Sequence, residues 1–186
     1  MANVLANEPY PKSILCKWGL TIISLLYEDP LSFSELAKRL QISNKVLSEK
    51  IKALSRSGLI YSVDGIKRLY CLTEKGREVA EIVKPAVSVG ITPLELHEVL
   101  SCKWMPQILS SLLTGDLFAV ELAEKVPGIS WKVLSQRLRK LQVFQMVRRE
   151  VIGSHPVRVR YSLDVKGRLM VKWMLTNATA LRGVVS

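Results

Sequence analysis

The fold is decided by residues 42–73, which read ISNKVLSEKIKALSRSGLIYSVDGIKRLYCLT. Near the start, Ser43 is suited to cap a helix, because its side-chain oxygen can accept a hydrogen bond from an N–H group of the first turn. The apolar residues that follow are spaced at intervals of four and three, on one stripe of a helix, and they are Leu47, Ile51 and Leu54. Gly58 suits the left-handed residue that closes a helix. This part of the stretch therefore predicts a helix with one buried face.

Two β-prone runs follow Gly58, over residues 59–63 and 69–72. Between them, the Asp64-Gly65 pair is a strong signal for a hairpin turn. Thr73 then stands where its side chain can cap a further helix. The second half of the stretch therefore predicts a β-hairpin followed by a helix.

Upstream of residue 42, the sequence has the pattern of two more helices. The crowded apolar residues after Trp18 end at Asp29-Pro30, and a second apolar pattern with helical spacing follows Ser34. Three helices followed by a β-hairpin form the winged helix-turn-helix plan, in which the third helix can enter the major groove of DNA.

The same pattern occurs twice along the chain. Shared elements keep their order at offsets of 86 (16 to 102), 87 (45 to 132) and 91 (70 to 161) residues: Cys16-Lys17-Trp18 with Cys102-Lys103-Trp104, Lys45-Val46-Leu47-Ser48 with Lys132-Val133-Leu134-Ser135, and Tyr70-Cys71-Leu72 with Tyr161-Ser162-Leu163. This kept order indicates an internal duplication. The hairpin tip of the second copy, residues 152–158, is longer than that of the first.

The duplication predicts the domain organisation. We expect a mainly α fold with small β-hairpins (α+β), built as two tandem winged helix-turn-helix domains. A segment bounded by Pro85 and Pro93 separates the copies. The expected parts are a first domain at residues 10–84, a linker at 85–92, a second domain at 93–178 and a tail at 179–186.

The chain is strongly basic. Among its 186 residues, 27 Lys and Arg stand against 16 Asp and Glu, which gives a net charge of +11 and an isoelectric point near 9.8. Such an excess predicts attraction to a polyanion, either nucleic acid or an acidic membrane surface. No apolar run reaches the length of a membrane-spanning helix, and the first residues lack the plan of a signal peptide, so we expect a cytoplasmic protein without a membrane partner.

The sequence offers no pattern of a catalytic or metal site. Cys16, Cys71 and Cys102 lie far apart without CxxC pairs, and only His97 and His155 could join them as ligands. There is no Gly-rich phosphate loop and no HExxH motif. We therefore expect no enzyme activity, no metal, no cofactor and no disulfide framework.

Polar and basic residues occupy the predicted outward face of the third helix in both copies. In DNA-binding proteins, Asn and Gln pair with adenine, Arg pairs with guanine, and Lys and Ser mostly contact the backbone. Basic residues of the two hairpins are further candidates for phosphate or minor-groove contacts. The predicted DNA-contacting residues are Asn44, Lys45, Ser48, Lys52, Arg56, Lys67 and Arg68 in the first copy, and Trp131, Lys132, Ser135, Gln136, Arg139, Lys140, Arg158 and Arg160 in the second.

Some of these assignments have an alternative. Glu49 lies on the same face and would be repelled by phosphates, so either it pairs with Lys45 or Lys52, or the first copy binds DNA weakly. Trp131 can touch a thymine methyl group or pack against a neighbouring helix. The polar helix faces can be merely solvated, and the basic hairpin residues can be ordinary exposed strand residues.

These motifs resemble the HxlR-type winged-helix transcription regulators of bacteria and archaea. The first copy carries that pattern as Lys17-Trp18, Phe33-Ser34-Glu35-Leu36, the run 42–47, Gly58-Leu59-Ile60 and the run 70–76. The second copy carries it as Lys103-Trp104, Glu121-Leu122, the run 128–134, Pro156 in the wing, and Tyr161-Ser162-Leu163 leading to Gly167. The resemblance implies a fold of winged helices and a role in transcription.

The chain departs from that family pattern in several places. Family members usually carry one such domain and pair as homodimers, so we expect a monomeric pseudo-dimer or a homodimer. The family's redox-sensing cysteine lies well before the Lys-Trp pair, whereas Cys16 and Cys102 abut it, so thiol sensing is not carried over. Gln145 stands where the first copy has Gly58, and Arg160 predicts a more cationic second wing.

The leading functional prediction is sequence-specific binding of double-stranded DNA by the third helix and wing of each domain, in order to regulate transcription. Tandem winged helices also serve as protein-interaction or assembly subunits, which is the main alternative, and a nonspecific architectural DNA binder is another. RNA binding is a lesser alternative, because the sequence lacks the exposed aromatic platform that single-strand recognition usually uses.

Overall fold

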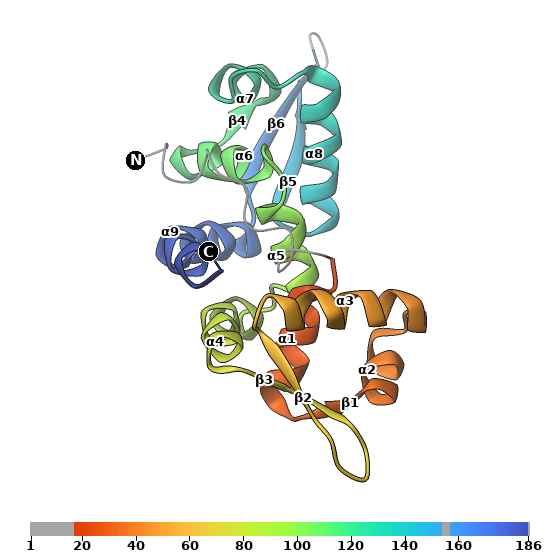
Figure 1. Ribbon diagram of the computed structural model, residues 1–186. Helices are drawn as coiled ribbons and strands as arrows, with labels where there is room; N and C mark the ends of the chain where they lie inside the picture. Colours follow the sequence, from red (N-terminus) through yellow and green to blue (C-terminus); the bar gives the residue numbers. More distant parts are fainter. Residues whose placement is uncertain (1–16, 154–156, 186) are drawn as a thin grey trace.

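The computed structural model of the chain describes residues 17–153 and 157–185. Cys16 and the hairpin-tip residues His155 and Pro156 lie outside these ranges. Figure 1 shows two domains one above the other, with three helices where they meet: α4 (Glu74–Ser88), α5 (Pro93–Leu100) and α9 (Val165–Val185). The hairpins of the two domains point to opposite ends of the molecule.

The first domain has the predicted three helices, hairpin and final helix. A two-residue strand, β1, was not predicted; it pairs with β3 and completes an antiparallel sheet in the order β1-β3-β2. The elements before α4 are α1 (Gly19–Glu28), β1 (Leu31–Ser32), α2 (Phe33–Leu40), α3 (Asn44–Arg56), β2 (Ile60–Val63) and β3 (Leu69–Leu72).

The second domain repeats this plan, with a sheet in the order β4-β6-β5. The predicted α+β fold of two tandem winged helix-turn-helix domains is therefore confirmed. Between α5 and α9 lie α6 (Met105–Ser111), a 3-10 turn η1 (Leu112–Thr114), β4 (Leu117–Phe118), α7 (Ala119–Lys125), α8 (Trp131–Val143), β5 (Val147–Ile152) and β6 (Arg158–Leu163).

The predicted caps and apolar stripe account for the third helix. The Ser43 hydroxyl accepts the backbone N–H of Val46 at 3.4 Å, and Ser130 accepts that of Val133 at the same distance. The apolar stripe of α3 is buried, as expected, and consists of Leu47, Ile51 and Leu54. Its equivalent in α8 consists of Leu134, Leu138 and Leu141. Each stripe fixes which face of the helix points outward.

Helices extend into the segments expected as linker and tail, over residues 85–88 of the linker and through residue 185 of the tail. Helix α4 continues through Pro85 to Ser88, although proline removes a backbone donor. Pro85 lies on the exposed face, while Val83 and Ala86 on the opposite face are buried, so packing offsets the missing hydrogen bond. Helix α9 likewise continues to Val185, and within it Leu181 is buried. The outer domain boundaries stay predictions.

The two domains meet in an apolar joint. Helix α4 packs against α9, and α1 packs against α5 (Figure 1). The indole N–H of Trp173 in α9 donates to the backbone carbonyl of Ile82 in α4 at 3.0 Å. Of the apolar residues of α9, Val171 and Met174 are both buried, whereas Leu175 is 56% exposed. The last helix therefore uses the face with Val171 and Met174 within the chain.

Two glycines permit a close backbone approach at the start of α4 and α9. A Cβ added at Gly76 would lie 2.0 Å from the Leu59 carbonyl oxygen, and one added at Gly167 would lie 2.0 Å from the Met146 carbonyl oxygen. Each carbonyl accepts a backbone N–H at 3.0 Å from the residue that precedes the helix, and these residues are Thr73 and Asp164. The helix and the hairpin therefore meet through backbone atoms, with no room for a side chain.

We expect Gly167→Ala to lower the free energy of unfolding by roughly 1–3 kcal/mol, the usual cost of forcing extra atoms into a packed site. Gly183→Ala is the matched control, since Gly183 lies in the same helix and no atom lies within 4 Å of its added Cβ. This control should raise stability by up to about 1 kcal/mol, because alanine favours a helix. Urea unfolding measures both, and equal stabilities would contradict the close contact.

Gly58 and Gln145 occupy equivalent left-handed positions after the third helix. Their φ angles are +66° and +57°. A side chain at such an angle crowds its own backbone, so Gln145 adopts this conformation at a cost that Gly58 avoids. The second domain keeps the turn because the flanking helix and strand require it.

Gln145→Gly should therefore stabilise the protein by about 1 kcal/mol, and Gly58→Gln should destabilise it by a similar amount. The two substitutions can be compared directly. Nothing lies within 4 Å of a Cβ added at Gly58, so a side chain there meets no neighbour and the backbone angle is the main difference. Thermal unfolding reports both changes. A shift of the same sign in both variants would show that the backbone angle is not the cause.

Candidate nucleic-acid interface

The outward face of α3 presents the predicted polar and basic residues to solvent. Asn44, Lys45, Lys52 and Arg56 are exposed, and Ser48 is half-buried. Glu49 is exposed on the same helix, and among the described residues it forms no ion pair with Lys45 or Lys52. The face is therefore basic with one uncompensated carboxylate.

A hollow between α3 and the first hairpin brings helix and wing residues together. Its volume is about 450 Å³. It is lined by Ser48, Lys52, Ser55 and Arg56 of α3, by Ser62, Arg68 and Tyr70 of the hairpin region, and by Phe33 and Ile51 beneath them. The sequence predicted Ser48, Lys52 and Arg56 on the helix and Arg68 on the hairpin as separate groups, and the fold joins these four in one concave surface.

Arg68 has a carboxylate beside it at the first hairpin. Its Nε donates to Asp64 Oδ1 at 2.6 Å, and this hydrogen bond raises the pKa of Arg68 above its ordinary value. Both side chains are well exposed, so the pair is weak and screened by salt. Lys67, also exposed, forms no ion pair among the described residues.

Helix α8 presents most, but not all, of the predicted residues. Lys132, Ser135, Gln136 and Arg139 are exposed, and Trp131 is 55% exposed, so Trp131 does not pack into the core. The remaining predicted residue of α8, Lys140, lies toward α5 instead. Its Nζ is 2.5 Å from Glu98 Oε2 and 5.8 Å from the centre of the Phe144 ring. This ion pair ties the end of α8 to α5.

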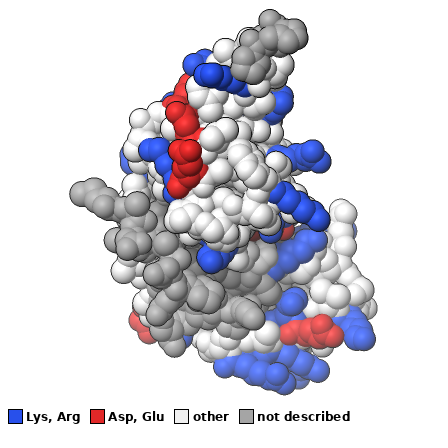
Figure 2. Space-filling model, turned by 90° about the horizontal axis from the view of Figure 1, so that it is seen from above, with Lys and Arg blue, Asp and Glu red and all other residues white. Residues whose placement is uncertain are grey.

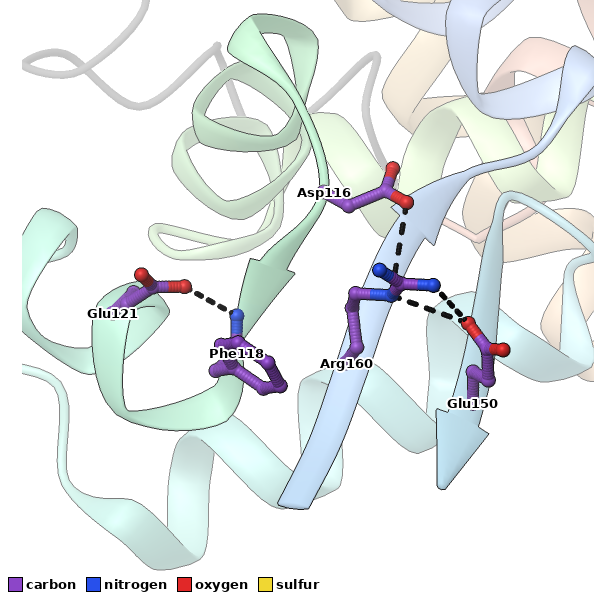
Figure 3. Close-up of polar contacts among 5 residues, drawn as sticks. All are labelled: Asp116, Phe118, Glu121, Glu150 and Arg160. Atoms are coloured by element: carbon purple, nitrogen blue, oxygen red, sulfur yellow. Dashed lines mark hydrogen bonds and ion pairs between the residues drawn. The ribbon is translucent and has the colours of Figure 1, made fainter. Parts of the chain in front are cut away.

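The second wing is less cationic than Arg160 suggested. Figure 3 shows the guanidinium of Arg160 between two carboxylates. Its Nη2 is 2.6 Å from Glu150 Oε2, and its Nε is 3.9 Å from Asp116 Oδ2. The hydrogen bond that Arg160 donates to Glu150 is the main cause that raises the pKa of Arg160. Arg158 is exposed, with its guanidinium 5.7 Å from the centre of the Phe118 ring.

The repeated Glu-Leu-Ala motif has a structural role. Glu35 accepts the backbone N–H of Ser32 at 2.7 Å, and the Ser32 hydroxyl is the main cause that lowers the pKa of Glu35. Glu121 accepts the backbone N–H of Phe118 at 2.6 Å in the same way (Figure 3). Each carboxylate satisfies an amide at the start of its helix, which explains why both copies keep it.

Basic side chains project from the side of the molecule that carries the third helices. Seen from above, Lys and Arg line the right-hand edge, the side on which α3 and α8 lie in Figure 1, and an acidic row lies to the left (Figure 2). In the described ranges, no cluster of His, Cys, Asp or Glu could hold a metal ion. None of the helices described is both long enough and apolar enough to cross a bilayer.

The sequence pattern of the HxlR-like helix-turn-helix family matches residues 14–93 and 99–178, which together make up most of the chain. The chain belongs to this family. The two matches fall on the two domains, so the chain carries two HxlR-like units in tandem. Relatives such as YvaP are named as HTH-type transcriptional regulators and not as enzymes, in line with the prediction, so the chain belongs to a family of transcriptional regulators.

Single-domain stretches of this HxlR-like protein are similar to HTH-type transcriptional regulators of Bacillus subtilis. The uncharacterized HTH-type transcriptional regulator YvaP is 38% identical over 73 residues, which are 39% of this chain and 68% of YvaP. YodB, another HTH-type transcriptional regulator, is 37% identical over 65 residues, which are 35% of this chain and 58% of YodB. The crystal structure of diamide-treated YodB is 33% identical, with a TM-score of 0.41, over 45% of this chain and 83% of that chain.

Sequence reasoning did not place every residue that lines the hollow at the HxlR-like interface. Phe33, Ser55, Ser62 and Tyr70 line it but were not among the predicted DNA-contacting residues. The pairing of Tyr70 with Ser62 across the hairpin sets the position of Tyr70, and the alternation of strand residues could have indicated it. By contrast, nothing local to Lys140 or Arg160 indicates the carboxylates that they meet.

Proposed function

We propose that this regulator binds double-stranded DNA sequence-specifically through the third helix and the wing of each domain. The observation that carries the proposal is the repeated placement of exposed basic and amide side chains on α3 and α8, each beside a hairpin with basic residues. A helix of this kind fits the major groove, where Arg and amide side chains recognise base edges.

The charges of the chain support DNA binding rather than a role as a protein-interaction module. The net charge of +11 favours a polyanion, and the side that carries α3 and α8 is lined by Lys and Arg (Figure 2). In this arrangement, Lys45 and Lys132 suit phosphates, whereas Asn44, Gln136 and Arg139 suit base edges. Lys140 and Arg160, already paired with carboxylates, contribute less.

A single chain supplies both DNA-binding surfaces in this proposal. The apolar joint between α4 and α9 holds the two domains together within one chain. We therefore expect a monomeric pseudo-dimer rather than a homodimer. Light scattering should give a mass near the 20.9 kDa of one chain.

Arg139→Ala should weaken binding to a selected operator by about 1–3 kcal/mol, roughly five- to more than a hundredfold in affinity. Lys172→Ala is the control, since Lys172 is exposed on α9, which lies on the other side of the second domain from α8 (Figure 1). Fluorescence anisotropy with a labelled duplex measures both. Equal losses in the two variants would contradict a role for α8 in recognition.

The salt dependence tests the same proposal independently. If both domains contact DNA and neutralise about 6–10 phosphates, log K should fall with log salt at a slope of about −0.9 per phosphate. A nearly flat dependence would favour the protein-interaction alternative. Strong salt dependence without sequence preference would favour an architectural DNA binder.

Glu150→Gln should raise DNA affinity about two- to fivefold at low salt, because it frees Arg160 from an exposed ion pair of modest strength. Glu81→Gln makes the same change of charge on an exposed position of α4 and serves as the control. The gain should be specific to Glu150 and should shrink as salt is added. An equal gain in both variants would mean that net charge alone is responsible.

A further inference from the structure

The two third helices are alike where they are buried and mostly unlike where they are exposed. In register, α3 and α8 share Lys45 with Lys132, Val46 with Val133, Leu47 with Leu134, Ser48 with Ser135, and Leu54 with Leu141. They differ at Asn44 against Trp131, Glu49 against Gln136, Lys52 against Arg139, and Arg56 against Val143, and all of these side chains are exposed. The duplication has therefore kept the core together with one lysine and one serine of the contact face, and has changed these four exposed positions.

The exchanged residues prefer different base edges. An exposed carboxylate such as Glu49 accepts from the amino group of cytosine, whereas the carboxamide of Gln136 pairs with adenine. Arg56 suits guanine, whereas its counterpart Val143, 74% exposed, offers only an apolar contact such as that with a thymine methyl group. The two faces therefore favour different bases at these positions.

The joint holds these two unlike faces in one fixed relation. Trp173 bonds to the Ile82 carbonyl across α9 and α4, and the Glu98–Lys140 pair ties α8 to α5, which in turn packs on α1. Glu95, nearly buried, binds Lys166 of α9 at 2.7 Å. Helix α5 thus connects α8 and α9 of the second domain to α1 of the first domain.

We propose that one chain binds one asymmetric operator, in which two unlike half-sites follow each other in a fixed order and spacing. The inference rests on the proposed function and adds the class of DNA that is bound. A symmetric homodimer presents the same face twice and so selects a palindrome. This chain presents two different faces once each, so its operator has a direction.

The experiment selects bound duplexes from a random DNA pool. The full wild-type chain and its Glu49→Gln and Gln136→Glu variants are each used in a separate selection. These substitutions are isosteric, lie on exposed positions and make α3 resemble α8, or the reverse, at one place. The wild type should enrich a non-palindromic motif with two half-sites. Each variant should change the base preference about tenfold at one position, and the two positions should fall in different half-sites.

Several outcomes would overturn the asymmetric operator. A palindromic motif would do so while leaving specific DNA binding intact, as would light scattering that finds two chains on one operator. A motif with a single half-site, or one in which both substitutions act on the same half-site, would also contradict it. Failure to enrich any motif with the wild type would instead contradict the proposed function itself.

Discussion

The packing of α4 against α9 is the constraint on which the rest of the molecule depends. Each helix closes its own domain, and each also contributes its apolar face to the joint between the domains. The same two helices therefore serve both purposes. The buried residues of the two domains consequently form one continuous core.

The sequence predicts those parts of the fold that depend on local contacts. The caps at Ser43 and Thr73, the stripe of α3 and the turn at Gly58 depend on neighbours within a few residues, and all are present. The duplication then carries the same plan to the second domain. The two-residue strands β1 and β4 are too short to show a period of two, so nothing in the sequence indicated them. Helix α4 passes through Pro85 because its buried face packs on distant residues.

The same distinction applies to the candidate interface. The outward face of the third helix follows from its apolar stripe, so most of its residues are exposed as the sequence predicted. Lys140 is different, because its partner Glu98 belongs to α5, outside the repeated helices and 42 residues away. Arg160 meets Glu150 only because β5 and β6 are paired in that register. Long-range contacts of this kind leave no local pattern.

The joint also determines how the protein responds to its own abundance. Subunits of a homodimer separate on dilution, so the amount of competent dimer falls faster than the total concentration of chains. Two domains linked in one polypeptide stay at a high effective concentration for each other at any dilution. If the chain binds DNA as the proposed monomeric pseudo-dimer, occupancy of a target follows the first power of protein concentration. Such a regulator would work at copy numbers too low to sustain a dimer.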